Sequence, residues 1–298
     1  MVAKRENFAQ SLRSQWLGQR IRAHRERHGL ALQDVAPIIE REFSTLGAYE
    51  RAVWPMPLAV MPLLLDVYGI VDERERDLLL DTARYAWRIN QWDADTNPAE
   101  TSLPVIDYSW AQARAKQIWL YGATHVPVLL QTHSYLEALV RAKEGDVLPE
   151  HRVANLIRER MALQEVLTAR PPVQVRALVE ESALGRPVGG LSGLRDQLEH
   201  LIAVSQQANV TVQVLPATVG EHQALDGSFT VLNMREDYPP VVYLEHLGGR
   251  MFLEAGRAAR YVAAYKRLQE LAVSPQATSA HLATLVAGSD RAATAQVS

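Results

Sequence analysis

The sequence predicts an α+β protein, with an all-helical N-terminal bundle followed by a domain of helices packed on an antiparallel sheet. Two observations predict this division. Residues 16–70 repeat apolar positions at helical spacing, in short segments separated by tight turns. After residue 170 the pattern changes to short alternating segments, which are typical of strands joined by polar turns.

In the N-terminal bundle, Gly29 is a typical stop for a first helix. Pro37 lies inside an expected second helix, where it tends to kink the backbone, and Ser44 is expected to cap a third. Such short, tightly turned helices match a helix-turn-helix module. Its expected core consists of Leu17, Ile21, Val35, Leu46, Tyr49 and Leu64.

The domain boundaries follow from these changes of pattern. We expect a helix-turn-helix module at 1–70, a helical connector and linker at 71–104, a second domain at 105–288 and a tail at 289–298. The linker is assigned because the segment 90–104 is rich in Asn, Asp, Thr and Pro, which break helical periodicity.

The second domain is expected to start with helices and end with strands. Helices are expected at 109–122, 132–145, 149–168 and 192–208, and strands at 173–180, 209–216, 228–234, 239–247 and 250–255. The last strands are expected to form an antiparallel meander. Two C-terminal helices then precede the tail.

Composition limits the available chemistry. The chain has 298 residues, 48% hydrophobic and 22% charged, and no cysteine. The absence of cysteine excludes disulfides, thiolate metal sites and a cysteine nucleophile. No apolar segment has the length of a signal-peptide core or a membrane span, so we expect a cytoplasmic protein that does not contact a membrane.

Charge gives limited support for nucleic-acid binding. The net charge is −3, and residues 1–70 contain nine Lys and Arg against seven Asp and Glu, a surplus of two. The segment "RIRAHRER" concentrates four arginines. They form either a solvated helix face or a surface that contacts phosphates. Any binding of DNA is therefore expected to be weak.

The segments "LGQRIRAHRERHGLALQDVA", "FSTLGAYERAV" and "PLLLDVYGI" resemble the XRE-type helix-turn-helix of phage-repressor-like regulators. The later segments "PVLLQTHSYLEALVRA", "RMALQEVL", "ALVEESALGRPVGG", "NVTVQVLPATVGEHQALDGSFTVL" and "VVYLEHLGG" resemble the domain of unknown function that follows this module in many actinobacterial regulators. The resemblance implies a transcriptional regulator without catalytic activity. It also implies a homodimer and, in some members, a small partner protein encoded nearby.

The chain departs from this family in its third helix. Family members present a serine and an arginine to the major groove where this chain has Gly47 and Ala48. Neither can hydrogen-bond to a base edge, so either part of the readout is lost or unusual residues read the DNA. The glycine that usually follows the glutamate of this helix is also replaced. The residues expected at DNA are Gln33, Ser44, Thr45 and Arg51, with Arg20 and Arg41 as phosphate contacts.

The second domain departs as well, because Trp110, Val128 and Leu163 stand where a glutamate, a glycine and an arginine are usual. These changes indicate either a more apolar cavity or variation in packing. They motivate an alternative function, a cofactor-independent catalyst that cyclises or rearranges a small apolar substrate in natural-product biosynthesis. Its candidate groups are His125, Tyr135, His222 and Glu245. Metal and nucleotide motifs are absent from the sequence, so neither a metal nor a cofactor is expected.

The same polar residues also have simpler interpretations. The segment "GEHQALDGSF" is more typical of a structural turn than of a metal site, and a buried Glu245 would need Arg250 or His222 as a partner. Residues that either line a ligand pocket or belong to the core are Trp110, Trp119, Gln131, Tyr135, Phe229 and Tyr243. The leading hypothesis is a DNA-binding regulator whose second domain senses a small molecule or a protein partner.

Overall fold

The computed structural model describes residues 10–86, 108–145, 147–235, 238–246 and 249–296. The chain divides into two compact units. The first unit contains Met1–Ala111 and Glu236–Ala258, and the second unit contains Gln112–Arg235 and Ala259–Ser298. None of the helices within the described residues combines the length and the apolar character needed to cross a bilayer.

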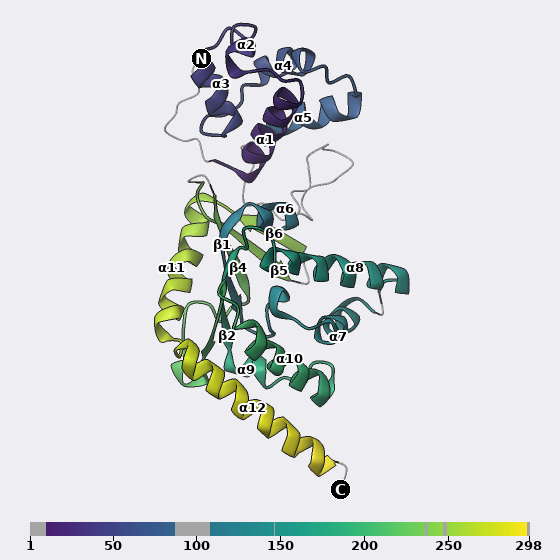
Figure 1. The fold of residues 1–298 in the computed structure, drawn as a ribbon, viewed down its shortest axis with the longest axis vertical. Helices are drawn as coiled ribbons and strands as arrows, with labels where there is room; N and C mark the ends of the chain where they lie inside the picture. Colours follow the sequence, from purple (N-terminus) through teal and green to yellow (C-terminus); the bar gives the residue numbers. More distant parts are fainter. Residues whose placement is uncertain (1–9, 87–107, 146, 236–237, 247–248, 297–298) are drawn as a thin grey trace. The chain divides into compact units, whose positions relative to one another are not determined.

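The elements are shown in Figure 1. The α-helices are α1 (Leu12–Arg27), α2 (Leu32–Val35), α3 (Phe43–Glu50), α4 (Met61–Val67), α5 (Glu73–Tyr85), α6 (Tyr108–Ala113), α7 (His133–Glu144), α8 (Glu150–Ala162), α9 (Glu181–Leu184), α10 (Gly190–Val204), α11 (Ala255–Leu271) and α12 (Pro275–Gln296). The strands are β1 (Ala115–Gly122), β2 (Gln174–Glu180), β3 (Val210–Leu215), β4 (Phe229–Met234), β5 (Val241–His246) and β6 (Gly249–Leu253). Short 3₁₀ helices are η2 (Leu58–Val60), η4 (Val128–Leu130), η5 (Leu163–Leu167) and η6 (Ala217–Val219).

The helical N-terminal bundle is confirmed, and so is its core. The six expected core positions are all buried: Leu17, Ile21, Val35, Leu46, Tyr49 and Leu64. Helix α1 ends at Arg27, and Gly29 follows with φ +67°, a conformation that glycine adopts without steric cost. Helix α2 ends before Pro37, which has no N–H to continue it.

Ser44 does not cap the third helix. Helix α3 begins at Phe43, and Glu42 occupies the cap position without a side-chain capping bond. The expected cap was wrong because the helix extends two residues further toward its N-terminus than a cap at Ser44 allows, which leaves Ser44 exposed in the first turn.

Helices α1 and α3 approach each other closely at Gly18. A Cβ atom at this position would lie 2.4 Å from the carbonyl oxygen of Glu50 and 2.9 Å from that of Tyr49. Both neighbours are backbone atoms, which cannot move aside as a flexible side chain would. A glycine is therefore required here, and it fixes how α3 lies on α1.

The α+β class is confirmed, but the sheet is mixed rather than wholly antiparallel. Its order is β3-β2-β1-β4-β5-β6. Strands β1, β2 and β3 are parallel, whereas β1 with β4 and β5 with β6 are antiparallel. The parallel part arises because helices α7 and α8 connect β1 to β2, and helices α9 and α10 connect β2 to β3. Such crossovers return the chain in the same direction.

Strand β1 corrects a second expectation, because a helix was expected over residues 109–122. Helix α6 ends at Ala113, and residues 115–122 form the strand instead. Ile118, Trp119, Leu120 and Tyr121 are all buried. A strand covered on both faces lacks the alternating pattern that would distinguish it from a helix.

Helix layers cover the sheet of the second unit. Helix α11 runs along one face of β1, β2 and β4, and α7, α8 and α10 lie on the other side (Figure 1). Helix α11 contacts the sheet through Tyr265, which stacks on Trp119 with ring centroids 5.0 Å apart. Helix α12 runs to Gln296, so a helix continues past the expected start of the tail at residue 289. The expected linker at 90–104 lies outside the described residues.

Candidate nucleic-acid interface and a buried carboxylate cluster

Helix α3 exposes fewer side chains than its sequence suggests. Phe43 and Ser44 are exposed and Thr45 is half-buried, but every position from Leu46 to Glu50 is buried. Gly47 and Ala48, which were expected to face the major groove, belong to the buried part. A Cβ atom at Gly47 would lie 3.0 Å from Arg51 Nη1 and 3.3 Å from Leu32 Cδ1. The side chains of neighbouring residues therefore cover this glycine.

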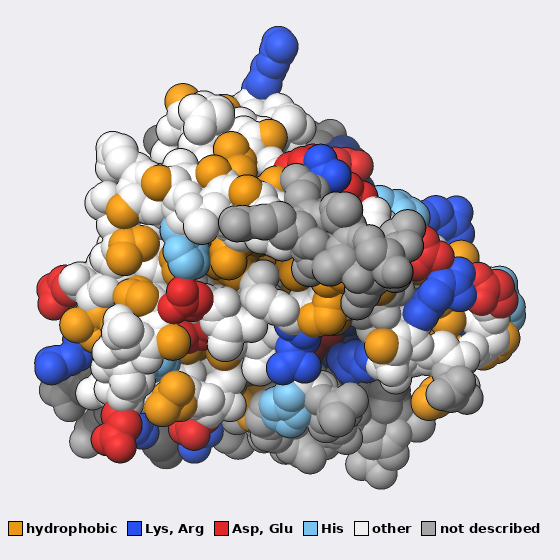
Figure 2. Space-filling model, turned by 90° about the horizontal axis from the view of Figure 1, so that it is seen from below, with side chains coloured by type: hydrophobic (Ala, Val, Ile, Leu, Met, Phe, Trp, Pro, Cys, Tyr) orange, Lys and Arg blue, Asp and Glu red, His pale blue; other side chains and the backbone are white. Residues whose placement is uncertain are grey.

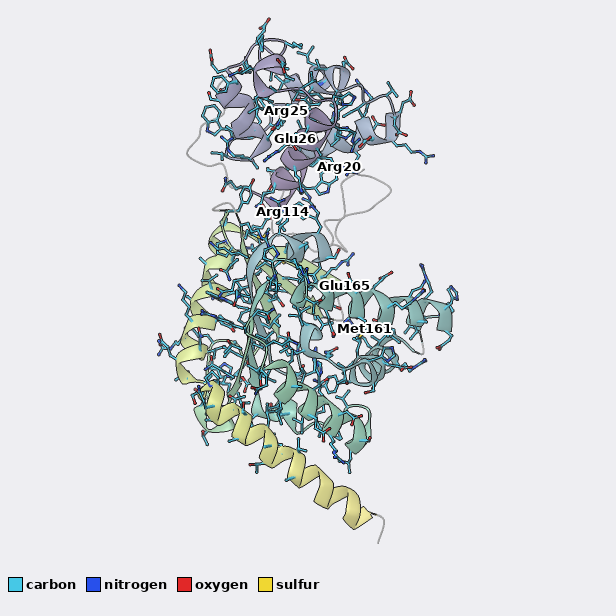
Figure 3. All side chains as sticks on the ribbon, viewed as in Figure 1. Arg20, Arg25, Glu26, Arg114, Met161 and Glu165 are labelled. Carbon is cyan, nitrogen blue, oxygen red and sulfur yellow. The ribbon has the colours of Figure 1, made fainter. Side chains whose placement is uncertain are left out.

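The other residues expected at DNA are accessible. Gln33, Arg20, Arg41 and Arg51 are exposed. Arg20 lies on α1 (Figure 3). Its guanidinium carbon is 5.7 Å from the centre of the Trp16 ring. Nη1 of Arg41 donates to the carbonyl oxygen of Glu40 at 2.8 Å.

A buried ion pair fixes the end of α3. Arg25 on α1 donates from Nε and Nη2 to the two carboxylate oxygens of Glu50, at 2.7 and 2.8 Å, and from Nη1 to the carbonyl oxygen of Leu30 at 2.7 Å. These bonds to Glu50 raise the pKa of Arg25 above its ordinary value. Both side chains are buried, so the pair locks α3 to α1 immediately before Arg51.

The charge of this region is not favourable for strong DNA binding. Residues 16–79 contain eight arginines, no lysine and ten acidic residues, a net charge of −2. Several arginines are also engaged in ion pairs, including Arg22 with Glu26 and Arg76 with Asp66. Few positive charges therefore remain for phosphates.

A second candidate site lies at the carboxyl ends of parallel strands β1 and β2. Tyr121 Oη donates to Glu180 Oε1 at 2.7 Å, and His222 Nε2 lies 3.0 Å from the same oxygen. Tyr121 is near the end of β1, Glu180 ends β2, and His222 precedes β4. Ligands of open sheets with parallel strands commonly bind outside the carboxyl ends of those strands.

The hydrogen bonds define the roles within this cluster. The backbone N–H of Ala224 donates to His222 Nδ1 at 3.2 Å. A neutral His222 therefore carries its proton on Nε2 and donates it to Glu180. Burial, followed by the hydrogen bond to Glu180, raises the pKa of Tyr121. Within the described residues, no lysine or arginine forms an ion pair with Glu180.

Aromatic rings surround this carboxylate. The Tyr121 ring lies 5.2 Å from that of Phe229 and 6.2 Å from that of His222, and Phe229 lies 5.0 Å from Tyr261. Glu180 was not identified from the sequence. The available signal for Glu180 was an acidic residue at the end of an apolar strand.

The four candidate catalytic groups have different hydrogen-bond partners. His222 is paired with Glu180, not with Glu245, which lies on β5 and accepts from Tyr243 Oη at 3.1 Å. Arg250, the other expected partner, is opposite Glu245 in the register of β5 and β6. His125 Nδ1 is 3.0 Å from Thr124 Oγ1, and Tyr135 Oη accepts from the backbone of Val126 at 3.3 Å.

The expected pocket residues belong to both units, and each has its own contacts. Phe229 and Trp119 lie on the sheet, and Trp119 stacks on α11. Gln131 Nε2 donates to the carbonyl oxygen of Val126, so it and Tyr135 hold the segment before α7. In the first unit, Tyr243 packs on Tyr108, and Trp110 Nε1 donates to Gln19 at 3.2 Å.

The surface in Figure 2 mixes hydrophobic side chains with separate basic and acidic groups, and the coloured part of this face has no continuous basic surface. Within the described residues, no three His, Cys, Asp or Glu side chains are placed to hold a metal ion.

Two family models match the chain. Residues 105–284 match a domain of unknown function, DUF5753, and residues 16–79 match a helix-turn-helix domain. No curated protein and no solved structure matches.

Proposed function

Because the chain belongs to the DUF5753 family and carries an XRE-type helix-turn-helix domain, we propose that it is a transcriptional regulator with an atypical DNA-reading surface and a sensing second unit. The supporting observation is that the core positions of the helix-turn-helix are buried, while most of the residues expected at DNA are exposed to solvent. Gln33, Ser44, Thr45 and Arg51 approach the bases, and Arg20 and Arg41 contact phosphates.

Sensing is proposed for the cluster of Tyr121, Glu180 and His222. Its carboxylate is held by two hydrogen-bond donors rather than by a fixed cation. A ligand that offers its own donors can therefore compete for Glu180 without first separating an arginine from it. A small molecule with a hydroxyl or amine group fits this site, and a protein partner is the alternative. None of the contacts described for the four candidate catalytic groups joins one of them to another, so they give no support to the hypothesis of a catalyst.

Gel-shift titration of the full chain tests DNA binding. The probe is duplex DNA from upstream of its own gene, and the competitor is unrelated duplex of the same length. We expect a specific complex at physiological salt. Replacing both Arg20 and Arg41 by Ala should weaken specific and competitor binding by the same factor, because phosphate contacts carry no sequence information. Arg141→Ala, in the second unit, is the control and should change neither.

Binding that ignored sequence and disappeared at physiological salt would contradict the proposal.

A further inference from the structure

Three positions form a stripe on α3. Phe43, Gly47 and Arg51 are spaced four residues apart, so their Cα–Cβ directions fall on one face of the helix and its C-terminal cap. The middle position has no side chain. The Arg51 guanidinium extends back over it, with Nη1 3.0 Å and Cζ 3.8 Å from where a Cβ of residue 47 would stand. An arginine head group therefore occupies the space that Gly47 leaves open.

The charge of Arg51 is available for an external partner. Its guanidinium is exposed and forms no ion pair with any described residue. The adjacent Glu50 does not capture it, because Arg25 already binds both oxygens of that carboxylate.

The backbone at Arg51 is also held in place. Arg25 anchors the preceding residue, and Tyr238 Oη donates to the carbonyl oxygen of Arg51 at 2.5 Å. A side chain that starts from a fixed backbone loses less conformational entropy when it binds.

We propose that Arg51 reads a guanine in the major groove, through the gap left by Gly47. The planar guanidinium donates two parallel hydrogen bonds to guanine O6 and N7, the commonest specific contact between a side chain and a base. This inference rests on the proposed DNA binding. It means that Gly47 is part of the readout, because it lets an arginine one turn later take the place of the missing side chain.

Selection from a random-sequence duplex library tests this proposal, using the full chain and its variants Arg51→Ala, Arg51→Lys and Gly47→Ala. The unchanged chain should enrich a motif with an invariant guanine. Each variant should lose discrimination at that guanine by about 5- to 150-fold, the range expected for one bidentate contact. Arg51→Lys keeps the charge but lacks the planar guanidinium that donates two parallel hydrogen bonds. Gly47→Ala keeps Arg51 but places a methyl group 3.0 Å from its Nη1.

Replacing the invariant guanine by 7-deazaguanine, which lacks the N7 acceptor, gives a second readout. It should weaken binding of the unchanged chain and leave binding of Arg51→Ala unaffected. Arg41→Ala is the matched control: the loss of a phosphate contact should weaken binding of every sequence by one factor, while the motif and the sensitivity to 7-deazaguanine are preserved. Circular dichroism of each variant checks that the helices are retained.

Two results would overturn the proposal while leaving the regulator intact. One is an Arg51→Ala variant that selects the same motif with the same discrimination. The other is an Arg51→Ala variant that binds every sequence more weakly by the same factor. The slope of its affinity against salt concentration would then be smaller by about one, as expected for the loss of one phosphate contact. If the unchanged chain enriched no motif, the proposed DNA readout would fail together with the role of Arg51.

Discussion

In the first unit Glu50 is held by a guanidinium, whereas in the second unit Glu180 is held by a phenol and an imidazole. Both carboxylates are largely shielded from solvent, with side-chain exposures of 3% and 14%. The partner of Glu50 is permanently charged. Glu180 is held by two donors, neither of which is a permanent cation. The difference separates a fixed support, which positions α3, from the cluster that we propose as a sensing site.

The largest expected effect comes from removing the cation of the fixed pair. Arg25→Met leaves Glu50 buried without a counter-charge, and we expect a loss of about 3–5 kcal/mol in the free energy of unfolding of the first unit. Urea unfolding monitored by circular dichroism measures it. Arg22→Met is the matched control, because Arg22 lies on the same helix in an exposed pair with Glu26. Equal losses in the two variants would show that the buried pair is no stronger than a surface one.

A third carboxylate, Glu254, sharpens the comparison because its environment favours the neutral form. It is 7% exposed and accepts from the backbone N–H of Leu12 at 2.6 Å. Burial raises its pKa from 4.5 to about 7, although this hydrogen bond and the charge of Arg13 act in the opposite direction. Between these two values the folded chain binds more protons than the unfolded chain. Stability of the first unit should therefore fall as pH rises through this range, by up to about 1.4 kcal/mol per pH unit.

Glu254→Gln should remove this slope, since an amide does not titrate, while its oxygen can still accept from Leu12. Urea unfolding at a series of pH values between 4.5 and about 7 measures the slope. An unchanged slope in the variant would assign the pH dependence to other groups.

For the cluster of Tyr121, Glu180 and His222 we expect a smaller loss of stability. Glu180→Gln leaves both donors, Tyr121 and His222, with a neutral amide oxygen in place of the carboxylate. Hydrogen bonds to a charged acceptor are the stronger ones, so we expect a loss of about 1–3 kcal/mol in the stability of the second unit. Glu199→Gln is the control, because Glu199 lies in an exposed pair with Arg195 on α10. A Glu180→Gln variant as stable as this control would mean that the cluster contributes no net stability.

The smallest expected effect on stability concerns Ala52, the residue after the C-terminal cap of α3. Ala52 is buried with φ +52°, at the position where the resemblance led us to expect a glycine. Ala52→Gly should relieve this backbone conformation and raise stability by up to about 1 kcal/mol. Ala48→Gly, inside the helix, should lower it by about 1 kcal/mol. Thermal unfolding distinguishes the two signs, and a destabilised Ala52→Gly variant would argue that the lost methyl contacts outweigh the strain.

The sequence predicted most where local spacing decides the structure. Leu17, Ile21 and Leu64 follow helical periodicity, and all are buried as expected. Strand β1 was not predicted because its pairing partners β2 and β4 are distant in sequence, and burial on both faces removes the alternating pattern.

The candidate site was predicted less well than the fold. The burial of Gly47 depends on how Arg51 and Leu32 lie over it, which spacing alone does not reveal. His222 was identified as a polar residue of interest, but its partner Glu180 comes from the end of strand β2, which is distant in sequence. Residues that meet only through the arrangement of the sheet leave no local signal in the sequence.

The central place of β1 has a consequence for the order in which the chain acquires its structure. Immediately after β1, Ala123 donates to Ser228, 105 residues further along the chain. During synthesis, the edge of β1 that pairs with β4 stays unpaired until that distant segment has been made. Such long-range pairing slows folding and exposes an unpaired strand to other chains. The helix-turn-helix core is complete within residues 17–79 and has no such delay. A nascent chain can therefore hold a folded helix-turn-helix before the middle of its sheet is formed.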